Sequence, residues 1–378
     1  MGIAGAQHQR RTVDLEDLRR ISERTPMHRK DSDDFYGRRV LSNSSSDTDE
    51  EPGDELVCVT SGVSLLGLAL VNQLLQRGFS VRILLDNPDD AEDGEKVREM
   101  KLKSEAGGGV SRISTLSADL TESHSLVNAF EGCRGVFHTS SFIDPSGLTG
   151  YSKAMVEVEK KVSENVMEAC ARTSSVRYCV FTSSLLACIW RDGTRAELPP
   201  VVDHDCWSDR SLCNDKKLWY ALGKLKAEKA AWRIAKERDI KLVTICSALV
   251  TPPPNLSTTN STPTIAYLKG AEEMYEQGLL ATVSVRRLAE AQVNVYEAMG
   301  ENEAHGRYIC FDQIIKTGAE AEALAREICI PITKICQSQE EEASTSTSSK
   351  FQLSNKRLFN LTSSRAPSTR CYSLNAFP

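Results

Sequence analysis

The chain has 378 residues, of which 40% are hydrophobic and 26% charged, and its formal net charge is −6. This length and composition are typical of one large globular domain or of two packed ones. The acidic balance, and the lack of a dense Lys/Arg stripe interleaved with aromatic residues, argue against a nucleic-acid surface. No apolar run reaches the roughly eighteen residues that span a bilayer, and the first forty residues lack the apolar stretch of a secretory signal. We therefore expect a cytoplasmic protein with no membrane partner.

The twelve cysteines are many for a protein of a reducing compartment, but their spacing indicates no metal site. No Cys-x-x-Cys pair and no cysteine/histidine cluster with zinc-ligand spacing occurs in the sequence. Cys58, Cys179 and Cys246 lie in apolar, strand-like runs, where a thiol acts as a small buried hydrophobe. We predict no bound metal ion.

Residues 1–54 are polar and include a serine and acid tract, which cannot bury enough apolar surface to fold alone, so we predict a disordered extension. From Leu56 onward, short apolar runs alternate with longer amphipathic ones. The pattern predicts strands at 56–60, 80–85, 112–116, 134–138, 177–182 and 241–246, and helices at 65–77, 94–103, 122–130, about 151–173 and 216–237. Such alternation is typical of an α/β fold with a doubly wound parallel sheet covered by helices on both faces.

The regular alternation ends at Pro252-Pro-Pro254. Beyond it, only 286–299 and 320–328 still predict helices, which indicates a smaller, loop-rich lobe. We expect a nucleotide-binding domain at 55–255 and a C-terminal substrate lobe made of 256–336 and 351–362. The stretch 337–350 is acidic and then rich in serine and threonine, which predicts a mobile loop, and 363–378 form a tail.

The turn after the first predicted strand has the setting of a dinucleotide site, because a strand leads through it into an amphipathic helix whose N-terminus suits a pyrophosphate. In extended short-chain dehydrogenases this turn reads Thr-Gly-x-x-Gly-x-x-Gly, and here Ser61 and Ser64 stand at the first two glycine places while Gly67 keeps the third. A side chain at Ser64 hinders close approach of the backbone to phosphate, but its hydroxyl can donate a hydrogen bond, so we expect weakened binding. The alternative is a strand–helix turn without a ligand. The candidate cofactor residues of this turn are Thr60, Ser61, Ser64, Leu65, Leu66 and Gly67.

Further cofactor contacts are predicted at the ends of the next strands of this Rossmann-type sheet. Asp86 follows Gly67 by nineteen residues, where a carboxylate accepts hydrogen bonds from an adenine-ribose diol and repels a 2′-phosphate, which favours NAD over NADP. The alternative is an exposed aspartate that opens the turn Asp86-Asn-Pro-Asp-Asp90. Asp119 and Leu120 are expected to face the adenine, and Thr139 to lie near the nicotinamide ribose.

Three residues in chain order carry the predicted chemistry. Tyr220 and Lys224 are four residues apart on a predicted helix and therefore share one face. A lysine one turn away stabilises a tyrosine phenolate and brings the pKa of the phenol toward the working range, so the pair can exchange a proton. Ser184 ends the fifth predicted strand, where its hydroxyl can orient a substrate carbonyl. Alone, the tyrosine–lysine spacing also arises by chance on solvated helices.

Several segments in this stretch form a specific combination: Val136-Phe-His-Thr139, Val180-Phe-Thr-Ser-Ser184, Val202-Asp-His-Asp-Cys-Trp-Ser-Asp209, Leu218-Trp-Tyr-Ala-Leu-Gly-Lys224 and Ala227-Glu-Lys-Ala-Ala-Trp232. Together they resemble the plant cinnamoyl-CoA reductase and dihydroflavonol reductase family of extended short-chain dehydrogenases, and most closely its cinnamoyl-CoA reductase-like branch. The resemblance runs from about Leu56 to Asp312 and returns at 351–358. It implies that Ser184 polarises a carbonyl, that Tyr220 exchanges the proton, and that Lys224 lowers the pKa of the tyrosine and holds the ribose. Hydride would come from NAD(P)H, with NADP as the family default.

The chain departs from the family at positions around this triad. Leu218, Ala221 and Leu222 replace the variable residues of Asn-Trp-Tyr-Cys-Tyr-Gly-Lys, and Asp86 replaces an arginine that recognises NADP. We predict an NAD(P)-dependent oxidoreductase that reduces a small-molecule aldehyde, ketone or acyl-CoA thioester of phenylpropanoid type. Two alternatives remain open: a catalytically weakened protein that keeps the fold as a binding or regulatory module, and an NAD-dependent epimerase or dehydratase.

Overall fold

The computed structural model describes residues 55–87, 89–105, 111–139, 151–191, 200–253, 262–336 and 351–364. The predicted extension 1–54, the predicted loop 337–350 and the tail beyond residue 364 lie outside the described residues. The predictions for those segments stay predictions.

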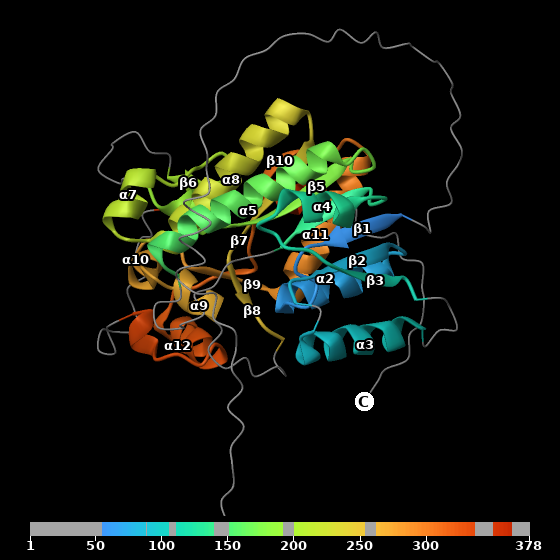
Figure 1. The fold of residues 1–378 in the computed structure, drawn as a ribbon. Helices are drawn as coiled ribbons and strands as arrows, with labels where there is room; N and C mark the ends of the chain where they lie inside the picture. Colours follow the sequence, from blue (N-terminus) through green and yellow to red (C-terminus); the bar gives the residue numbers. More distant parts are fainter. Residues whose placement is uncertain are drawn as a thin grey trace, which may run out of the picture.

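A seven-stranded parallel sheet forms the centre of the molecule (Figure 1), in the order β10-β7-β5-β4-β1-β2-β3. The chain enters at β1, moves outward to β3, and crosses back to β4 before continuing to the other edge. This reversal places a ligand crevice at the carboxyl ends of β1 and β4, and it confirms the predicted doubly wound α/β fold. The strands are β1 (Leu56–Val59), β2 (Ser80–Leu85), β3 (Ile113–Ser117), β4 (Gly135–His138), β5 (Tyr178–Ser184), β7 (Lys241–Ser247) and β10 (Gly306–Cys310).

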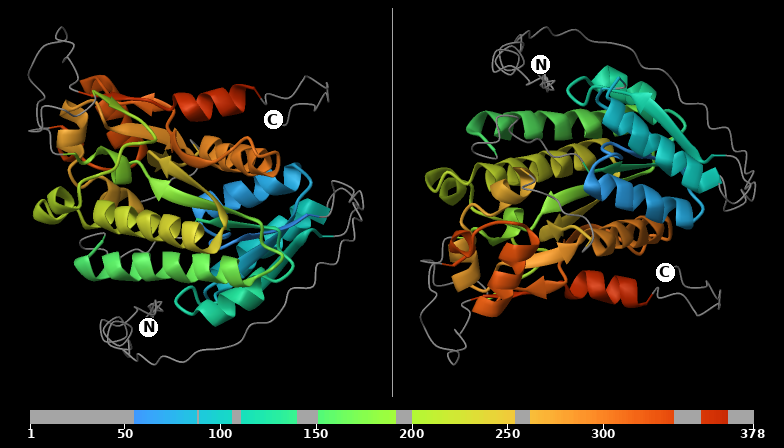
Figure 2. Two further views of the ribbon diagram at one scale, coloured as in Figure 1. Left: turned by 90° about the horizontal axis from the view of Figure 1, so that it is seen from above. Right: turned by 90° about the horizontal axis from the view of Figure 1, so that it is seen from below.

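Helices cover both faces of the sheet (Figure 2), and the alternation of side chains along each strand explains why. In β1, Val57 and Val59 join the hydrophobic core that contains residues of α2 and α11, whereas Cys58 joins the core beneath α4, α5 and α8. Each face of the sheet is therefore apolar. The covering helices are α2 (Leu65–Gln76), α3 (Ala91–Glu105), α4 (Ser123–Phe130), α5 (Lys153–Arg172), α8 (Trp219–Arg238) and α11 (Val285–Gly300).

Two helix boundaries differ from the sequence prediction for local reasons. Helix α3 begins at Ala91 because the Asp90 carboxylate accepts hydrogen bonds from the backbone N–H groups of Glu92 and Asp93, at 2.9 and 3.1 Å. Helix α8 begins only at Trp219 because Lys217 adopts a left-handed backbone conformation, with φ of 53°, that a helix cannot continue.

Several shorter elements follow the main strands; α9, α10 and α12 lie near β8 and β9 (Figure 1), whereas α13 packs against α11 and β10. Helix α11 and strand β10, although they come after Pro254, belong to the central layers. The division at residue 255 thus stays a prediction, and part of the later chain completes the main sheet. The shorter elements are α6 (Leu186–Ile189), β6 (Val201–Val202), α7 (Arg210–Asp215), β8 (Leu249–Thr251), α9 (Thr262–Tyr267), α10 (Ala271–Glu276), β9 (Ala281–Ser284), β11 (Gln313–Ile314), α12 (Gly318–Glu327), η1 (Ile332–Lys334), β12 (Gln352–Leu353) and α13 (Lys356–Ser363).

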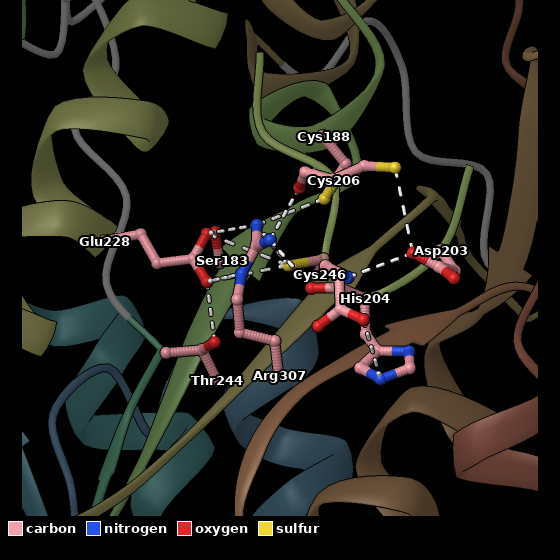
Figure 3. Close-up of polar contacts among 10 residues, drawn as sticks. Ser183, Cys188, Asp203, His204, Cys206, Glu228, Thr244, Cys246 and Arg307 are labelled. Carbon is pink, nitrogen blue, oxygen red and sulfur yellow. Dashed lines mark hydrogen bonds and ion pairs between the residues drawn. The ribbon is translucent and has the colours of Figure 1, made fainter. Parts of the chain in front are cut away.

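A fully buried carboxylate ties α8 to the sheet (Figure 3). Glu228 of α8 accepts hydrogen bonds from Arg307 Nε of β10 at 2.8 Å, from the Thr244 hydroxyl of β7 at 2.6 Å and from the Ser183 hydroxyl of β5 at 2.7 Å. The Arg307 guanidinium lies 3.5 Å from the centre of the Trp207 ring. Burial opposes the charge on Glu228, but Arg307 and the two hydroxyls outweigh it and lower the pKa of the carboxyl from 4.5. One side chain therefore sets the position of α8 over three neighbouring strands.

We predict that Glu228→Gln lowers the free energy of unfolding by about 3–5 kcal/mol at neutral pH, because it leaves the Arg307 charge buried without a counter-ion. The double variant Glu228→Gln/Arg307→Met should lose less than the two single variants together. Urea unfolding measures both effects. Because the folded-state pKa of Glu228 is depressed, the stability that its charge contributes is present above the unfolded value of 4.5 and is lost as the pH falls through the folded value.

The control for this prediction is Glu237→Gln on the same helix, since Glu237 forms a solvent-exposed pair with Arg233 at 3.0 Å. We expect that change to cost no more than about 0.5 kcal/mol. Equal losses in the two variants would contradict the role of Glu228.

Candidate active site

The ends of β1 and β4 are joined through the side chain of Thr60. Its buried hydroxyl lies 3.1 Å from His138 Nδ1 and accepts a hydrogen bond from the Thr139 amide at 3.3 Å. Burial, with a contribution from the Lys224 ammonium, lowers the pKa of His138 from 6.5 to about 3, so the imidazole is neutral at neutral pH. Thr60, predicted as a cofactor contact, thus connects the nucleotide turn to β4, and Lys224 acts electrostatically on the same strand end.

The turn between β1 and α2 is closely packed, and Ser64 begins the helix as its N-cap. The Ser64 hydroxyl accepts a hydrogen bond from the Gly67 amide at 3.0 Å and donates one to the Ser61 carbonyl at 2.7 Å. The hydroxyl that we expected to donate to a phosphate therefore donates within the turn. At position 67, a Cβ atom would lie 1.9 Å from the Ser61 carbonyl oxygen, so only glycine fits there. Leu65 and Leu66 form the partly buried first turn of α2.

Acidic side chains meet at the ends of β2 and β3. Asp86 is exposed directly after β2, and its pKa is raised by desolvation and then by repulsion from Asp119 and Asp93. Asp119 accepts hydrogen bonds from the amide and hydroxyl of Thr121, both at 2.7 Å. The Leu120 side chain is buried in the core beneath α4, and its contact with an adenine stays a prediction. This end of the crevice is strongly acidic.

The Ser184 hydroxyl lies buried at the carboxyl end of β5, opposite Ser247 of β7. It accepts a hydrogen bond from the Leu186 amide at 3.2 Å, at the start of α6. Its neighbour Ser183 points the other way, to Glu228, as the alternation of a strand requires. Ser184 therefore faces the loops that follow the sheet, on the side where ligands bind in this fold.

Tyr220 and Lys224 lie one turn apart at the start of α8, with the lysine Nζ 5.7 Å from the centre of the tyrosine ring. Lys224 is 4% exposed and forms an ion pair at 2.6 Å with Glu159 of α5, which is 5% exposed. Burial disfavours the charge on Lys224, but Glu159 and Tyr220 outweigh that effect and raise the pKa of the ammonium group above 10.5. The lysine is therefore held in its charged form beside the phenol.

Tyr151 closes the side of this cluster. Its hydroxyl lies 3.1 Å from the Met155 carbonyl and 3.3 Å from Glu159 Oε2, and its ring meets the Tyr220 ring edge-on at 5.2 Å. A Cβ atom at position 223 would lie 2.2 Å from this hydroxyl, so Gly223 allows Tyr151 to reach the carboxylate. Leu218, Ala221 and Leu222 are also buried, and they pack in the hydrophobic core around the tyrosine–lysine pair.

The sequence reasoning missed Glu159 and Tyr151, although one signal for Glu159 was available. Met155, Val158, Val162 and Val166 form the buried stripe of α5, and Glu159 falls within that stripe. A carboxylate on the apolar face of a predicted helix requires a buried partner, although the sequence does not show which lysine supplies it. For Tyr151 we find no comparable signal, because its position depends on the path of the chain into α5.

A dinucleotide cofactor fits this edge of the sheet on two observations. The turn at Gly67 brings the N-terminus of α2 against the end of β1, which leaves backbone N–H groups of the helix for a pyrophosphate. The Thr139 hydroxyl is buried and, within the described residues, has no hydrogen-bond partner. It offers a polar group at the end of β4, as expected for a ribose contact.

Comparisons with known proteins agree with this geometry. Residues 58–205 match the 3-beta hydroxysteroid dehydrogenase/isomerase family. Cinnamoyl-CoA reductase 1 of Petunia hybrida is 37% identical over 274 residues, which cover 72% of this chain and 77% of that protein. Cinnamoyl-CoA reductase 1 of Arabidopsis thaliana is 36% identical over 277 residues, which cover 73% of this chain and 75% of that protein. This chain belongs to the cinnamoyl-CoA reductase family.

The structure of vestitone reductase from alfalfa (Medicago sativa L.) is similar to this one in fold, with a TM-score of 0.55 at 21% identity, covering 81% of this chain and 91% of that one. The predicted family and the predicted class, an NAD(P)-dependent reductase, are confirmed by these relatives. In the described part of the chain, no helix is both long and apolar enough to cross a membrane.

We predict that Gly67→Ala destabilises the fold by at least about 1–3 kcal/mol, because the added methyl group overlaps the Ser61 carbonyl and forces α2 away from β1. Thermal and urea unfolding measure this loss. The control is Gly94→Ala in α3, where a Cβ atom would meet nothing within 4 Å. That change should leave stability equal or raise it by about 0.5–1 kcal/mol, as alanine favours a helix. A Gly67→Ala variant as stable as the control would show that the turn can relax.

Proposed function

We propose that this chain reduces the carbonyl of a small molecule, an aldehyde, ketone or acyl-CoA thioester, with Tyr220 as the proton donor. A nicotinamide cofactor supplies the hydride when it is bound. Ser184 orients the carbonyl oxygen through its hydroxyl, and Lys224 stabilises the tyrosine after its proton has left and holds the nicotinamide ribose. Thr139 and the first turn of α2 hold the rest of the cofactor.

One observation carries this proposal: a lysine that is buried and yet held in its charged form one turn from a tyrosine on the same helix face. A buried ammonium group is costly unless a partner compensates its charge, and Glu159 is the partner of Lys224. The same ammonium group stabilises a phenolate of Tyr220 at close range. Two relatives support the substrate class, because the proteins of Petunia hybrida and Arabidopsis thaliana compared above are named cinnamoyl-CoA reductases.

We further propose that NAD is preferred over NADP. Asp86, Asp119 and Asp93 interact electrostatically at the end of β2, where the adenine ribose lies in this fold. A ribose 2′-phosphate would add two negative charges beside three carboxylates. A 2′-hydroxyl can instead donate a hydrogen bond to Asp86.

A second function has support from the nucleotide turn. Because Ser64 uses the Gly67 amide for its own cap, one donor of the helix N-terminus is already occupied. The chain would then keep the fold as a binding module with low cofactor affinity. Cofactor titration separates this function from the first.

We expect NADH to change the fluorescence of the purified full-length protein. The change should saturate at an NADH concentration below millimolar. Tyr220→Phe should bind NADH with nearly unchanged affinity and lower the turnover of carbonyl substrates at least about 100-fold, as loss of a positioned acid does. Stopped-flow absorbance of NADH with a panel of aldehydes and acyl-CoA thioesters measures turnover. Absence of binding by both NADH and NADPH favours the binding module, and full turnover by Tyr220→Phe contradicts the assigned role.

We expect Asp86→Arg to shift the ratio of dissociation constants toward NADPH by about tenfold or more, since it replaces repulsion of the 2′-phosphate by a charged hydrogen bond. The matched control is Glu95→Arg on the exposed side of α3, which reverses one charge without facing the ribose. Fluorescence titration with NADH and NADPH gives two dissociation constants for each of the wild type, Asp86→Arg and Glu95→Arg. An equal shift in both variants would mean that only net charge matters, and Asp86 would lie elsewhere relative to the ribose.

A further inference from the structure

The Glu159–Lys224 pair has a feature that the reduction chemistry does not require. Both side chains are almost completely buried, and the carboxylate comes from α5, a different helix from the one that carries Tyr220 and Lys224. A second α5–α8 ion pair, Glu157 with Lys226 at 2.5 Å, already joins these helices at the surface. The buried pair is therefore not needed merely to bring the two helices together.

Other buried titratable groups lie around this pair and Tyr220, and the histidine and the tyrosines among them are neutral. His138 at the end of β4 is neutral because burial and Lys224 lower its pKa to about 3. Tyr151 before α5 and Tyr267 of α9 are neutral because burial raises the pKa of each phenol. Glu228, one turn beyond Lys224, is charged but is matched by Arg307. Within this surrounding group, Glu159 is the negative charge that acts on Lys224.

Glu159 is connected to Tyr220 on two sides, because Lys224 contacts the carboxylate at 2.6 Å and lies 5.7 Å from the tyrosine ring, and Tyr151 contacts both residues. In water an ion pair between exposed groups has little effect on a third group, but inside a protein each charge is weakly screened. A lysine alone would favour the phenolate form of Tyr220 strongly. A lysine paired with a carboxylate at 2.6 Å favours it less, because the carboxylate repels the phenolate.

We propose that Glu159 is a positioning residue of the Tyr220/Lys224 pair: its carboxylate fixes the Lys224 ammonium beside the tyrosine, offsets part of its charge, and so sets the pH range in which Tyr220 gives up its proton. This inference rests on the proposed function for its meaning in catalysis. Tyr151 takes part through its contact with Glu159 Oε2 and through its ring, which meets Tyr220 edge-on. Gly223 leaves the space that this arrangement needs.

The test is Glu159→Gln in the full-length chain, because glutamine keeps the size of the side chain and a hydrogen-bond acceptor for Lys224 while it removes the charge. Tyrosinate formation is followed by ultraviolet difference absorbance against pH in the cofactor-free protein. Subtraction of the matching Tyr220→Phe variant isolates the contribution of Tyr220. We expect Tyr220 to ionise at a pH lower by about one unit in Glu159→Gln, the order of magnitude for the loss of one nearby, weakly screened charge.

Two further variants keep the test decisive. Glu157→Gln removes the surface carboxylate two residues away and should leave the Tyr220 transition in place. Glu159→Asp keeps the charge but draws it back toward α5, and its transition should fall between those of the wild type and Glu159→Gln. Glu159→Asp also provides the test if Glu159→Gln does not fold. An unchanged transition in the Glu159 variants, or an equal shift in Glu157→Gln, overturns the proposal and leaves Glu159 a purely structural residue.

The pH dependence of turnover provides the second measurement. Tyr220 must be protonated to act as an acid, so the loss of reduction at high pH should begin at lower pH in Glu159→Gln. Failure of the proposed function would be seen in a different measurement. The wild-type protein would then bind neither NADH nor NADPH, while the absorbance titration of Tyr220 can still be made. The two failures are therefore distinguishable.

Discussion

The position of helix α8 depends on one buried carboxylate, and the candidate active site depends on the position of α8. Glu228 is held by Arg307 of β10, Thr244 of β7 and Ser183 of β5. Ser183 is also the residue before Ser184, so the same hydrogen bond that fixes the helix fixes the strand end that carries the predicted carbonyl-orienting hydroxyl. Three strands and the helix thereby form one rigid frame. Such a frame keeps reacting groups within the narrow distances that proton transfer requires.

Two buried carboxylates on neighbouring helices, Glu228 of α8 and Glu159 of α5, have different tasks because their partners differ. Glu228 meets a guanidinium and two hydroxyls, which together donate hydrogen bonds to both of its oxygen atoms. Glu159 meets an ammonium group that also acts on a tyrosine and on His138. A charge beside a stable guanidinium changes only stability, because arginine does not titrate in proteins. A charge beside a lysine and a tyrosine changes protonation as well, so it bears on chemistry.

Much of the fold could be predicted from the sequence because the sheet is buried on both faces. Continuous apolar strands and amphipathic helices then leave a clear pattern, and the residues at the ends of parallel strands, such as Ser184 and Thr139, must lie at one edge. Contacts between elements far apart in the sequence were harder to predict from the sequence pattern. Arg307 reaches Glu228 only because β10 returns to pair with β7, and that return lies beyond the point where the alternation weakens. A local pattern shows that Glu159 needs a buried partner, but not which of several lysines supplies it.

Carboxylates lie at both the cofactor end and the proton-transfer end of the crevice. A dinucleotide carries a negatively charged pyrophosphate, and this chain offers it little positive potential: Asp86, Asp119 and Asp93 interact at one end, and Glu159 offsets Lys224 at the other. Long-range attraction therefore contributes little to binding here. In the proposed function, recognition of the dinucleotide would come from short-range hydrogen bonds with the remaining amides of α2, with the Thr139 hydroxyl and between a ribose diol and Asp86. In the proposed function, the aspartates beside β2 would disfavour a 2′-phosphate, whereas Glu159 would restrain the effect of Lys224 on Tyr220. Cofactor preference and the acid strength of the tyrosine would then depend on different carboxylates, one set at each end of the crevice.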